Sequence, residues 1–369
     1  MAIDVEGRVE AQREPLSLTG TVTRLALIGI ILAVAAGGFA YLGGWLTPRA
    51  LTPARFTDTF QQVNGVHPGF RRNHAKGIGV SGFFQSNGNG VRFSRAVVFQ
   101  PGWVPVLGRF SVSGGQPHVA DSADTVRGLG LQFSLPDGEL WRTAMVNLPV
   151  FPFSTPEAFH SNLVASKPDP RTGHPDPTAM KAFLDRHPET VRAMSVIKSE
   201  PVAAGFENTT FYGLNAFRFI DGSGESTPVR WLLTPSQPFE DATGVPATHD
   251  PNYLFDQLTV KIHRQPLRWH LILTIGEPGD ATHDATVAWP ASRERVDVGT
   301  LTLDRVEAEE TSAATDLNFD PLVLPAGIAP SDDPLLSARS AVYSRSFTRR
   351  EGEAKPASAI TAADVRKGE

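Results

Sequence analysis

Segments in which apolar and polar residues alternate recur along the chain and are separated by turn residues, a pattern typical of antiparallel β-strands. In the clearest pair, segments 124–133 and 139–146 flank a Leu-Pro-Asp-Gly turn. Because no helical period interrupts this part of the chain, the pattern favours an antiparallel barrel over a doubly wound parallel sheet. Other strands are predicted at 91–100, 108–114, 206–219, 229–233, 258–262, 269–275 and 298–303.

The segment 71–94, RRNHAKGIGVSGFFQSNGNGVRFS, is predicted to form a β-hairpin. It contains an approach segment that ends at His74, a glycine-bearing strand, a QSNGNG turn and a second strand that begins at Val91. Alternation in the second strand would place Arg92 and Ser94 on one face. We therefore expect a histidine, a hydroxyl and a guanidinium to converge here, although a lone histidine in an apolar setting is also typical of a core residue.

Helical patterns are predicted to lie outside the strands, at 52–64, around 180–184, from Pro188, and over a short stretch at 251–257. A further helix is expected to begin at Asp332 or Asp333, which precede a proline. In that helix Arg339 and Tyr343 would lie one turn apart on the same face. By itself this spacing also fits an exposed amphipathic helix with a snorkelling arginine.

The N-terminal segment 25–45, LALIGIILAVAAGGFAYLGGW, is uncharged and long enough to cross the hydrocarbon core as a helix. Tyr41 and Trp45 would lie at the membrane interface. We predict a single-pass anchor after a leader at 1–24; a cleaved signal peptide with small residues near 35–38 is the alternative. Since a lone N-terminal span most often acts as a signal anchor, we expect an inner-membrane protein with an extracytoplasmic (periplasmic) domain.

Composition narrows the function further. The 369 residues can bury a large core as one domain. A net charge of −5 and the lack of a basic run argue against nucleic-acid binding. The chain has no cysteine, which excludes thiol peroxidases, thiolate-ligated or covalent c-type haem, iron–sulfur clusters and disulfides. Any metal must therefore use nitrogen or oxygen ligands.

Three ordered motifs resemble those of the haem catalases and the smaller catalase-related peroxidases. The first is RRNHAKG at 71–77, followed by a Phe-rich strand and VRFS at 91–94. The second is NLPVFPF at 147–153. The third is the pair Arg339 and Tyr343, separated by three residues.

The resemblance implies an α+β fold: a haem-binding, catalase-like antiparallel β-barrel with flanking helices at 51–350. The polar tail 351–369 is expected to be disordered. Only 26 residues follow Tyr343, so the long C-terminal region of full-size catalases, with its NADPH site, is expected to be absent. Asn73 stands where an apolar residue is usual in the family. These departures favour peroxidase over fast catalase activity and leave the oligomeric state open.

In the family a tyrosine binds the haem iron, so the resemblance implies haem b with Tyr343 as the metal ligand. A phenol pKa of about 10 must fall by about 3 units, or about 4 kcal/mol, for the phenolate to form at pH 7. The guanidinium of Arg339 at about 4 Å contributes that order of energy at an effective dielectric constant of about 20. Arg71, Arg92 and Arg350 are expected to bind the haem carboxylates.

On the other side of the haem, the resemblance implies that His74 moves a proton between the two peroxide oxygens. Asn147 would hold the substrate by a hydrogen bond, Ser94 would orient His74, and Phe151 would line the cofactor pocket.

These roles imply a peroxidase that reduces hydrogen peroxide or organic hydroperoxides with an external small-molecule electron donor and has weak catalase activity. A fatty-acid hydroperoxide isomerase or dehydratase of the same fold is one alternative. A non-enzymatic haem-binding or haem-sensing protein is the other, although His74 and Asn147 argue against it.

Overall fold

The computed structural model describes residues 17–42, 46, 50–244 and 250–367. The chain forms two units, 1–52 and 53–369. In the first unit, helix α1 (Leu18–Leu42) is long and apolar enough to cross a membrane, a test that signal sequences also pass. The helix begins seven residues before the predicted span. Trp45 lies outside the described residues.

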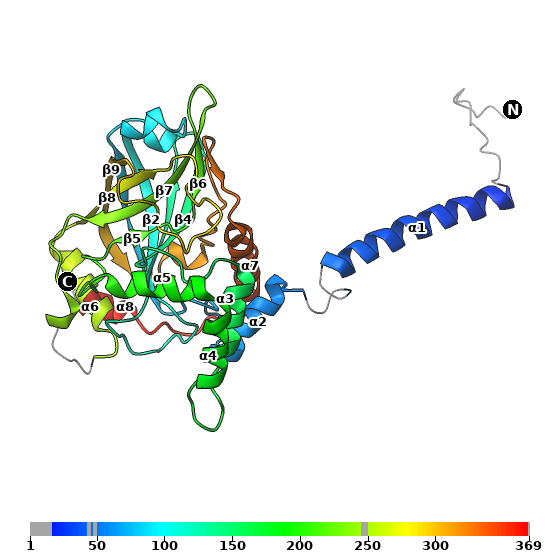
Figure 1. Cartoon of the computed structure of the whole chain (residues 1–369), viewed down its shortest axis with the longest axis horizontal. Coiled ribbons are helices and arrows are strands. Elements are labelled where there is room, and N and C mark those ends of the chain that lie inside the picture. Colours follow the sequence, from blue (N-terminus) through cyan, green and yellow to red (C-terminus); the bar gives the residue numbers. More distant parts are fainter. Residues whose placement is uncertain (1–16, 43–45, 47–49, 245–249, 368–369) are drawn as a thin grey trace, which may run out of the picture. The chain divides into compact units, whose positions relative to one another are not determined.

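The second unit is built on a closed antiparallel barrel (Figure 1). Neighbouring strands in the barrel are in the order β7, β5, β4, β3, β2, β1, β9, β8, and pairing between β7 and β8 closes it. β6 and then β10 extend the sheet beyond β7. The strands are β1 Gly77–Ser86, β2 Gly102–Val112, β3 Arg127–Ser134, β4 Leu140–Val146, β5 Phe211–Tyr212, β6 Phe217–Ile220, β7 Ser226–Pro235, β8 Leu267–Ile275, β9 Arg295–Glu307 and β10 Ile328–Pro330.

The alternation that predicted the barrel separates its inner and outer faces. In β3, Leu129, Leu131 and Phe133 belong to the buried core. Phe133 stacks on Trp141 of β4 with 4.7 Å between ring centroids, so the barrel interior is filled by side chains. The intervening residues of β3 include Gly130, whose lack of a side chain leaves room on the outer face. A ligand must therefore bind outside the barrel rather than in its lumen.

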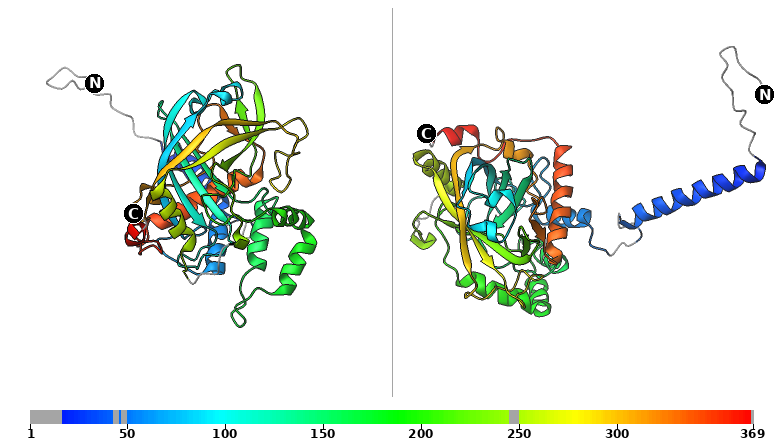
Figure 2. Two further views of the ribbon diagram at one scale, coloured as in Figure 1. Left: turned by 90° about the vertical axis from the view of Figure 1, so that its left-hand side faces the viewer. Right: turned by 90° about the horizontal axis from the view of Figure 1, so that it is seen from above.

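Helices cover the outside of the barrel. They are α2 Pro53–Asn64, α3 Pro156–Ala165, α4 Pro177–Arg186, α5 Pro188–Ser199, α6 Tyr253–Arg264, α7 Pro334–Glu351 and α8 Ala362–Lys367, with short 3₁₀ turns at Asn89–Arg92, Val97–Phe99, Ala242–Gly244 and Ala313–Asp316. As predicted, α7 begins after Asp333, whose carboxylate accepts a hydrogen bond from Leu335 N at 2.9 Å. α7 packs against α2 and α3 on one side of the barrel (Figure 2).

Two strand predictions are wrong. The segment after the QSNGNG turn forms the 3₁₀ turns Asn89–Arg92 and Val97–Phe99, and β1 pairs instead with β2. The segment 258–262 belongs to helix α6. Its buried residues Leu254, Leu258 and Ile262 recur every four positions, which is a helical period that the strand prediction overlooked.

The prediction of a disordered tail is also wrong for residues 351–367. Ile360 and Val365 are buried in the main hydrophobic core. Glu353 forms an ion pair with Arg72, and its Oε2 also accepts a hydrogen bond from Gly69 N at 2.7 Å. The haem-domain boundary predicted at 350 therefore lies too early, because the tail is part of the folded unit.

The Arg72–Glu353 pair is expected to stabilise the fold far more than the exposed pair Arg92–Glu294. The Arg72 side chain is only 3% exposed, so Glu353→Ala leaves a buried charge unpaired and should cost about 3 kcal/mol of unfolding free energy. Glu294→Ala should cost less than about 1 kcal/mol, since the side chains of Arg92 and Glu294 are both about half exposed. Urea denaturation of the chain from Leu51 onward measures both values; equal losses would contradict this ranking.

Candidate active site

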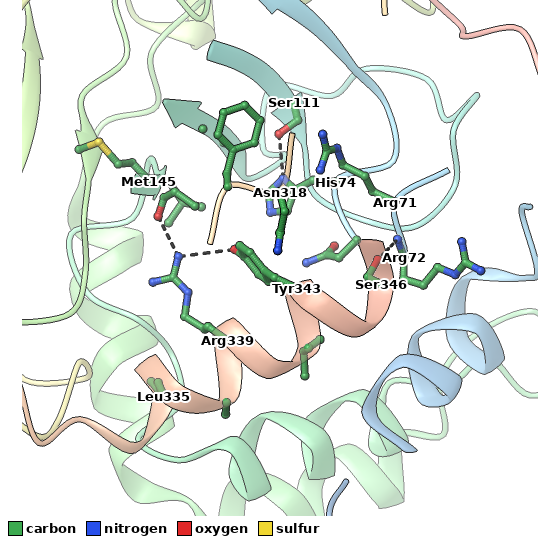
Figure 3. A pocket seen from close by; sticks show the side chains of 18 of the residues that line it. Arg71, Arg72, His74, Ser111, Met145, Asn318, Leu335, Arg339, Tyr343 and Ser346 are labelled. Carbon is green, nitrogen blue, oxygen red and sulfur yellow. Dashed lines mark hydrogen bonds between the residues drawn. The ribbon is translucent and has the colours of Figure 1, made fainter. Parts of the chain in front are cut away.

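A cavity lies between the outer face of the barrel and helix α7 (Figure 3). Its barrel side is formed by residues of β2, β3 and β4, and its opposite side by α7, α2 and the start of α3. Several of the predicted site residues line it: Arg71, His74, Phe151, Arg339, Tyr343 and Arg350. The structure thus brings together residues that are up to 279 positions apart in the sequence.

On α7, Arg339 and Tyr343 lie on one face, as the spacing predicts. Arg339 Nη2 donates to Tyr343 Oη at 3.5 Å and to Ala144 O at 2.8 Å, and Nη1 donates to Asn215 Oδ1. Asn215 Nδ2 in turn donates to a carboxylate oxygen of Asp333 at 2.7 Å. The phenol therefore stands at the end of a hydrogen-bonded chain that fixes the arginine beside it.

Asp333, the last residue in this series of hydrogen bonds, is buried. Burial raises the pKa of Asp333, while the hydrogen bonds from Asn215 and Leu335 N and the charge of Arg339 act in the opposite direction. The side-chain carbonyl of Asn215 accepts from Arg339, and its amide nitrogen donates to Asp333. It is a positioning residue for Arg339 that the sequence did not reveal, because its partners lie 118 and 124 positions away.

His74 is held with its ring against the barrel. Its Nδ1 lies 3.1 Å from Ser111 Oγ, and a Cβ added at Gly128 would approach the ring to 3.0 Å, so β3 needs a glycine there. Burial, followed by the charges of Arg109, Arg71 and Arg339, lowers the pKa of His74 to about 3. The imidazole is therefore neutral at physiological pH and able to take up a proton from a reactant.

Three guanidinium groups line another part of the cavity. Arg71 Nη2 donates to the carbonyls of Ala314, Thr315 and Leu317 at 3.1, 3.3 and 3.0 Å. Burial, followed by the charges of Arg109 and Arg350, lowers the pKa of Arg71 well below its usual value.

Only part of this positive charge is neutralised by nearby acids. Arg109 Nε pairs with Glu309 at 2.5 Å. Arg350 donates from Nη1 to Thr315 O, whereas its Nε and Nη2 are buried without a hydrogen-bond partner in the described part of the chain. Buried guanidinium donors of this kind are suited to bind carboxylate groups of a ligand.

Arg92 and Ser94 do not belong to the cavity, so their predicted roles are wrong. Arg92 is exposed and pairs with Glu294, and Ser94 Oγ donates to Gly327 O at 2.8 Å. The tripeptide Arg-Phe-Ser occurs twice in the sequence, and the second copy begins at Arg109. That copy lies on the regular strand β2 and supplies both the cavity guanidinium and Ser111.

The predicted contact of Asn147 with the substrate is not found either. Asn147 follows the last residue of β4, and its Oδ1 accepts a hydrogen bond from Arg127 N at 2.8 Å. The neighbouring Val146 lines the cavity, whereas Asn147 is not among the lining residues. Sequence spacing alone could not resolve this difference of one position, which decides the face of a strand end.

Solved structures show the class of fold. A fungal catalase superposes with a TM-score of 0.70 at 20% identity, covering 93% of this chain and 64% of that one. A bacterial catalase gives a TM-score of 0.68 at 22% identity, covering 78% and 58%. The chain thus spans about three fifths of the length of these solved catalases. These superpositions define a catalase-type fold.

The sequence comparison specifies the family. Residues 47–358 match the family model described as Catalase, and the chain belongs to the catalase family. It is 37% identical to a catalase-related peroxidase of Synechococcus elongatus, covering 88% of this chain and 94% of that protein. A catalase-related peroxidase of Mycolicibacterium paratuberculosis is 34% identical, with 82% and 96% covered. The protein is accordingly an oxidoreductase that acts on peroxide.

The family implies a haem cofactor, and the cavity fits one. Tyr343 offers an oxygen ligand beside a fixed guanidinium, and the unpartnered donors of Arg350 are suited to a carboxylate. On the barrel wall, Gly130 allows the ring of Phe319, another lining residue, to pack closely on the strand, since an added Cβ would approach this ring to 2.7 Å. Among the described residues, no cluster of His, Asp and Glu offers a competing metal site.

The repeated tripeptide gives a matched pair of variants. Ser111→Ala removes the hydroxyl beside His74 Nδ1 and should slow the reaction with hydrogen peroxide by about tenfold, because the imidazole loses its orienting partner. Ser94→Ala removes a hydroxyl that is also buried but does not line the cavity, and it should leave this rate unchanged. Stopped-flow measurement of both variants checks the assignment, and a rate loss confined to Ser94→Ala would refute it.

The lowered pKa of His74 predicts a flat pH profile. A histidine with a pKa of about 3 stays neutral throughout the range from pH 8 to pH 5, so its ability to accept a proton is constant there. The bimolecular rate constant with hydrogen peroxide should accordingly change by less than about twofold over this range. A titration near pH 6.5 that disappears in His74→Gln would show that the imidazole is not shielded from water.

Proposed function

We propose that the protein is a haem b-dependent peroxidase that reduces hydrogen peroxide and organic hydroperoxides with an external small-molecule electron donor, and that it retains weak catalase activity. The observation that carries this proposal is the Arg339–Tyr343 pair in one cavity with a neutral His74. The names of the two catalase-related peroxidases support the same reading.

The residues have distinct roles in this mechanism. Tyr343 would hold the iron, while Arg71, Arg109 and Arg350 would hold the carboxylates of the cofactor. The bound cofactor would supply the two electrons that cleavage of the peroxide bond requires, and the external donor would return them. The imidazole of His74 takes the proton from the inner peroxide oxygen and delivers it to the outer one, which leaves as water or as an alcohol.

The second group of residues acts without touching the substrate. Ser111 fixes the orientation of the imidazole through Nδ1, so that the other ring nitrogen is available for the proton transfer. Arg339 stabilises the anionic form of the phenol, and Asn215 with Asp333 holds this guanidinium in place.

Organic hydroperoxides are included because one side of the cavity is apolar. Phe56, Phe60, Phe151 and Phe159 line it, and their rings contact one another, with 5.4 Å between the centroids of Phe56 and Phe159. This phenylalanine wall could bury the carbon chain of a hydroperoxide.

The same wall supports the second candidate, an isomerase or dehydratase of fatty-acid hydroperoxides. Product analysis separates the two: a peroxidase yields the alcohol and an oxidised donor, whereas an isomerase or dehydratase consumes no donor. A non-enzymatic haem-binding protein has no use for the His74–Ser111 pair.

For location, we propose that α1 anchors the protein in the inner membrane with the haem-binding unit on the extracytoplasmic side. The length and apolar composition of the helix support this, and a cleaved signal sequence is the alternative. N-terminal sequencing of the mature protein from the membrane fraction distinguishes the two.

The decisive experiment is the optical spectrum of the ferric protein with haem supplied. The wild-type protein should show a high-spin spectrum with a tyrosinate ligand, and Tyr343→Phe should lose it or bind haem at least tenfold more weakly, since the oxygen ligand is gone. Tyr253→Phe, at a residue outside the cavity lining, is the matched control and should resemble the wild type. A spectrum that is unchanged in Tyr343→Phe would show that Tyr343 is not the iron ligand.

A further inference from the structure

The mechanism lacks a second polar group next to His74, because Asn147 does not line the cavity. Three other asparagines line it: Asn73, Asn215 and Asn318. Asn215 is committed at both ends of its amide to Arg339 and Asp333. Asn73 and Asn318 are therefore the two candidates for this polar group.

Asn73 has one end of its carboxamide fixed and the other end free. Its Oδ1 accepts a hydrogen bond from Gly114 N at 2.8 Å. Because a backbone N–H can bond only to the oxygen end, this contact fixes the orientation of the amide. The two N–H donors on Nδ2 then have no hydrogen-bond partner within the described parts of the chain.

The backbone explains how Asn73 and His74 can line the same cavity. In an extended chain, consecutive side chains point to opposite faces. His74 has a φ of 57°, in the left-handed region that residues other than glycine rarely adopt, so the alternation is broken at this position. Such local strain persists where surrounding contacts over-determine it, often at functional sites.

Those surrounding contacts converge on Gly114 and Arg109. Gly114 N donates to Asn73, and Gly114 O accepts from Ala75 N at 2.9 Å, so one residue clamps both neighbours of the histidine. Arg109 donates to His74 O at 2.9 Å and to Ala75 O at 3.1 Å. The position of Asn73 relative to His74 is therefore rigid.

The side-chain amide of Asn318 has no hydrogen-bond partner among the described residues either, and Figure 3 draws it in the same cavity. Its backbone, however, directly follows the segment whose carbonyls are held by Arg71 and Arg350, and its own carbonyl accepts from Arg142 Nη1 at 3.0 Å. Within the described part of the chain, no contact fixes the side-chain amide of Asn318, whereas Gly114 N fixes that of Asn73. Asn73 is the amide that is joined directly to the histidine.

We propose that Asn73 Nδ2 donates the hydrogen bond that holds a peroxide oxygen beside His74, the task predicted for Asn147. The donor N–H binds an oxygen lone pair while the imidazole handles the proton, so no covalent step at Asn73 is needed. This inference rests on the proposed haem-dependent function. It assigns to Asn73 a polar role at a position where an apolar residue is usual in the family.

Two substitutions at Asn73 test the proposal in the haem-loaded full-length protein. Asn73→Leu removes the donor without adding charge. It should weaken the binding of fluoride, measured by optical titration, by about tenfold. Asn73→Asp keeps the oxygen that accepts from Gly114 N, which protects the fold, but loses the N–H donor. Its reaction with neutral hydrogen peroxide should slow by about tenfold.

Asn147→Asp is the matched comparison, because it keeps the oxygen that accepts from Arg127 N and loses the same N–H donor. It should change neither the fluoride affinity nor the peroxide rate by more than about twofold. Wild-type values for both Asn73 variants, or a loss confined to Asn147→Asp, would overturn the inference while leaving haem binding intact. A wild-type protein that binds no haem would instead overturn the proposed function, and this inference with it.

Discussion

The positive charge of Arg71, Arg109 and Arg350 organises the whole site. Because guanidinium groups are costly to bury without acceptors, backbone carbonyls lie close to them. Arg71 collects the carbonyls of the segment that precedes Asn318, and Arg109 collects those of His74 and Ala75. Burial, followed by the charges of Arg109, Arg71 and Arg339, suppresses protonation of the imidazole. Loop placement and part of the pKa shift of His74 thus depend on Arg71 and Arg109.

The barrel shapes the cavity through positions on its outer face that carry no side chain. At Gly128 and Gly130 of β3, an added Cβ would lie 3.0 Å from the His74 ring and 2.7 Å from that of Phe319. The filled interior, with Trp141 stacked on Phe133, keeps this wall rigid, so that small residues on the outer face define a cavity of fixed shape. A closed barrel is suited to this task because it has no free edge that could slip in register.

Features encoded over short distances could be predicted from the sequence, and those set by long-range packing could not. The spacing of Arg339 and Tyr343 and the cap at Asp333 follow from helix geometry, and the structure has both. The choice between two Arg-Phe-Ser copies depended on which strand faces His74, and the nearer copy, at Arg92, was the wrong one. Likewise the tail is polar in composition, yet a few apolar residues such as Ile360 anchor it to the core.

The cavity separates charge from apolar surface, and this separation orients whatever binds there. Guanidinium groups stand together near the segment that Arg71 and Arg350 hold, whereas Phe56, Phe151 and Phe159 form a wall from α2, α3 and the residues before α3. A flat group with carboxylates at one edge gains hydrogen bonds in only one orientation. Held at that edge by the guanidinium groups, it would leave the phenylalanine wall available for the carbon chain of a hydroperoxide.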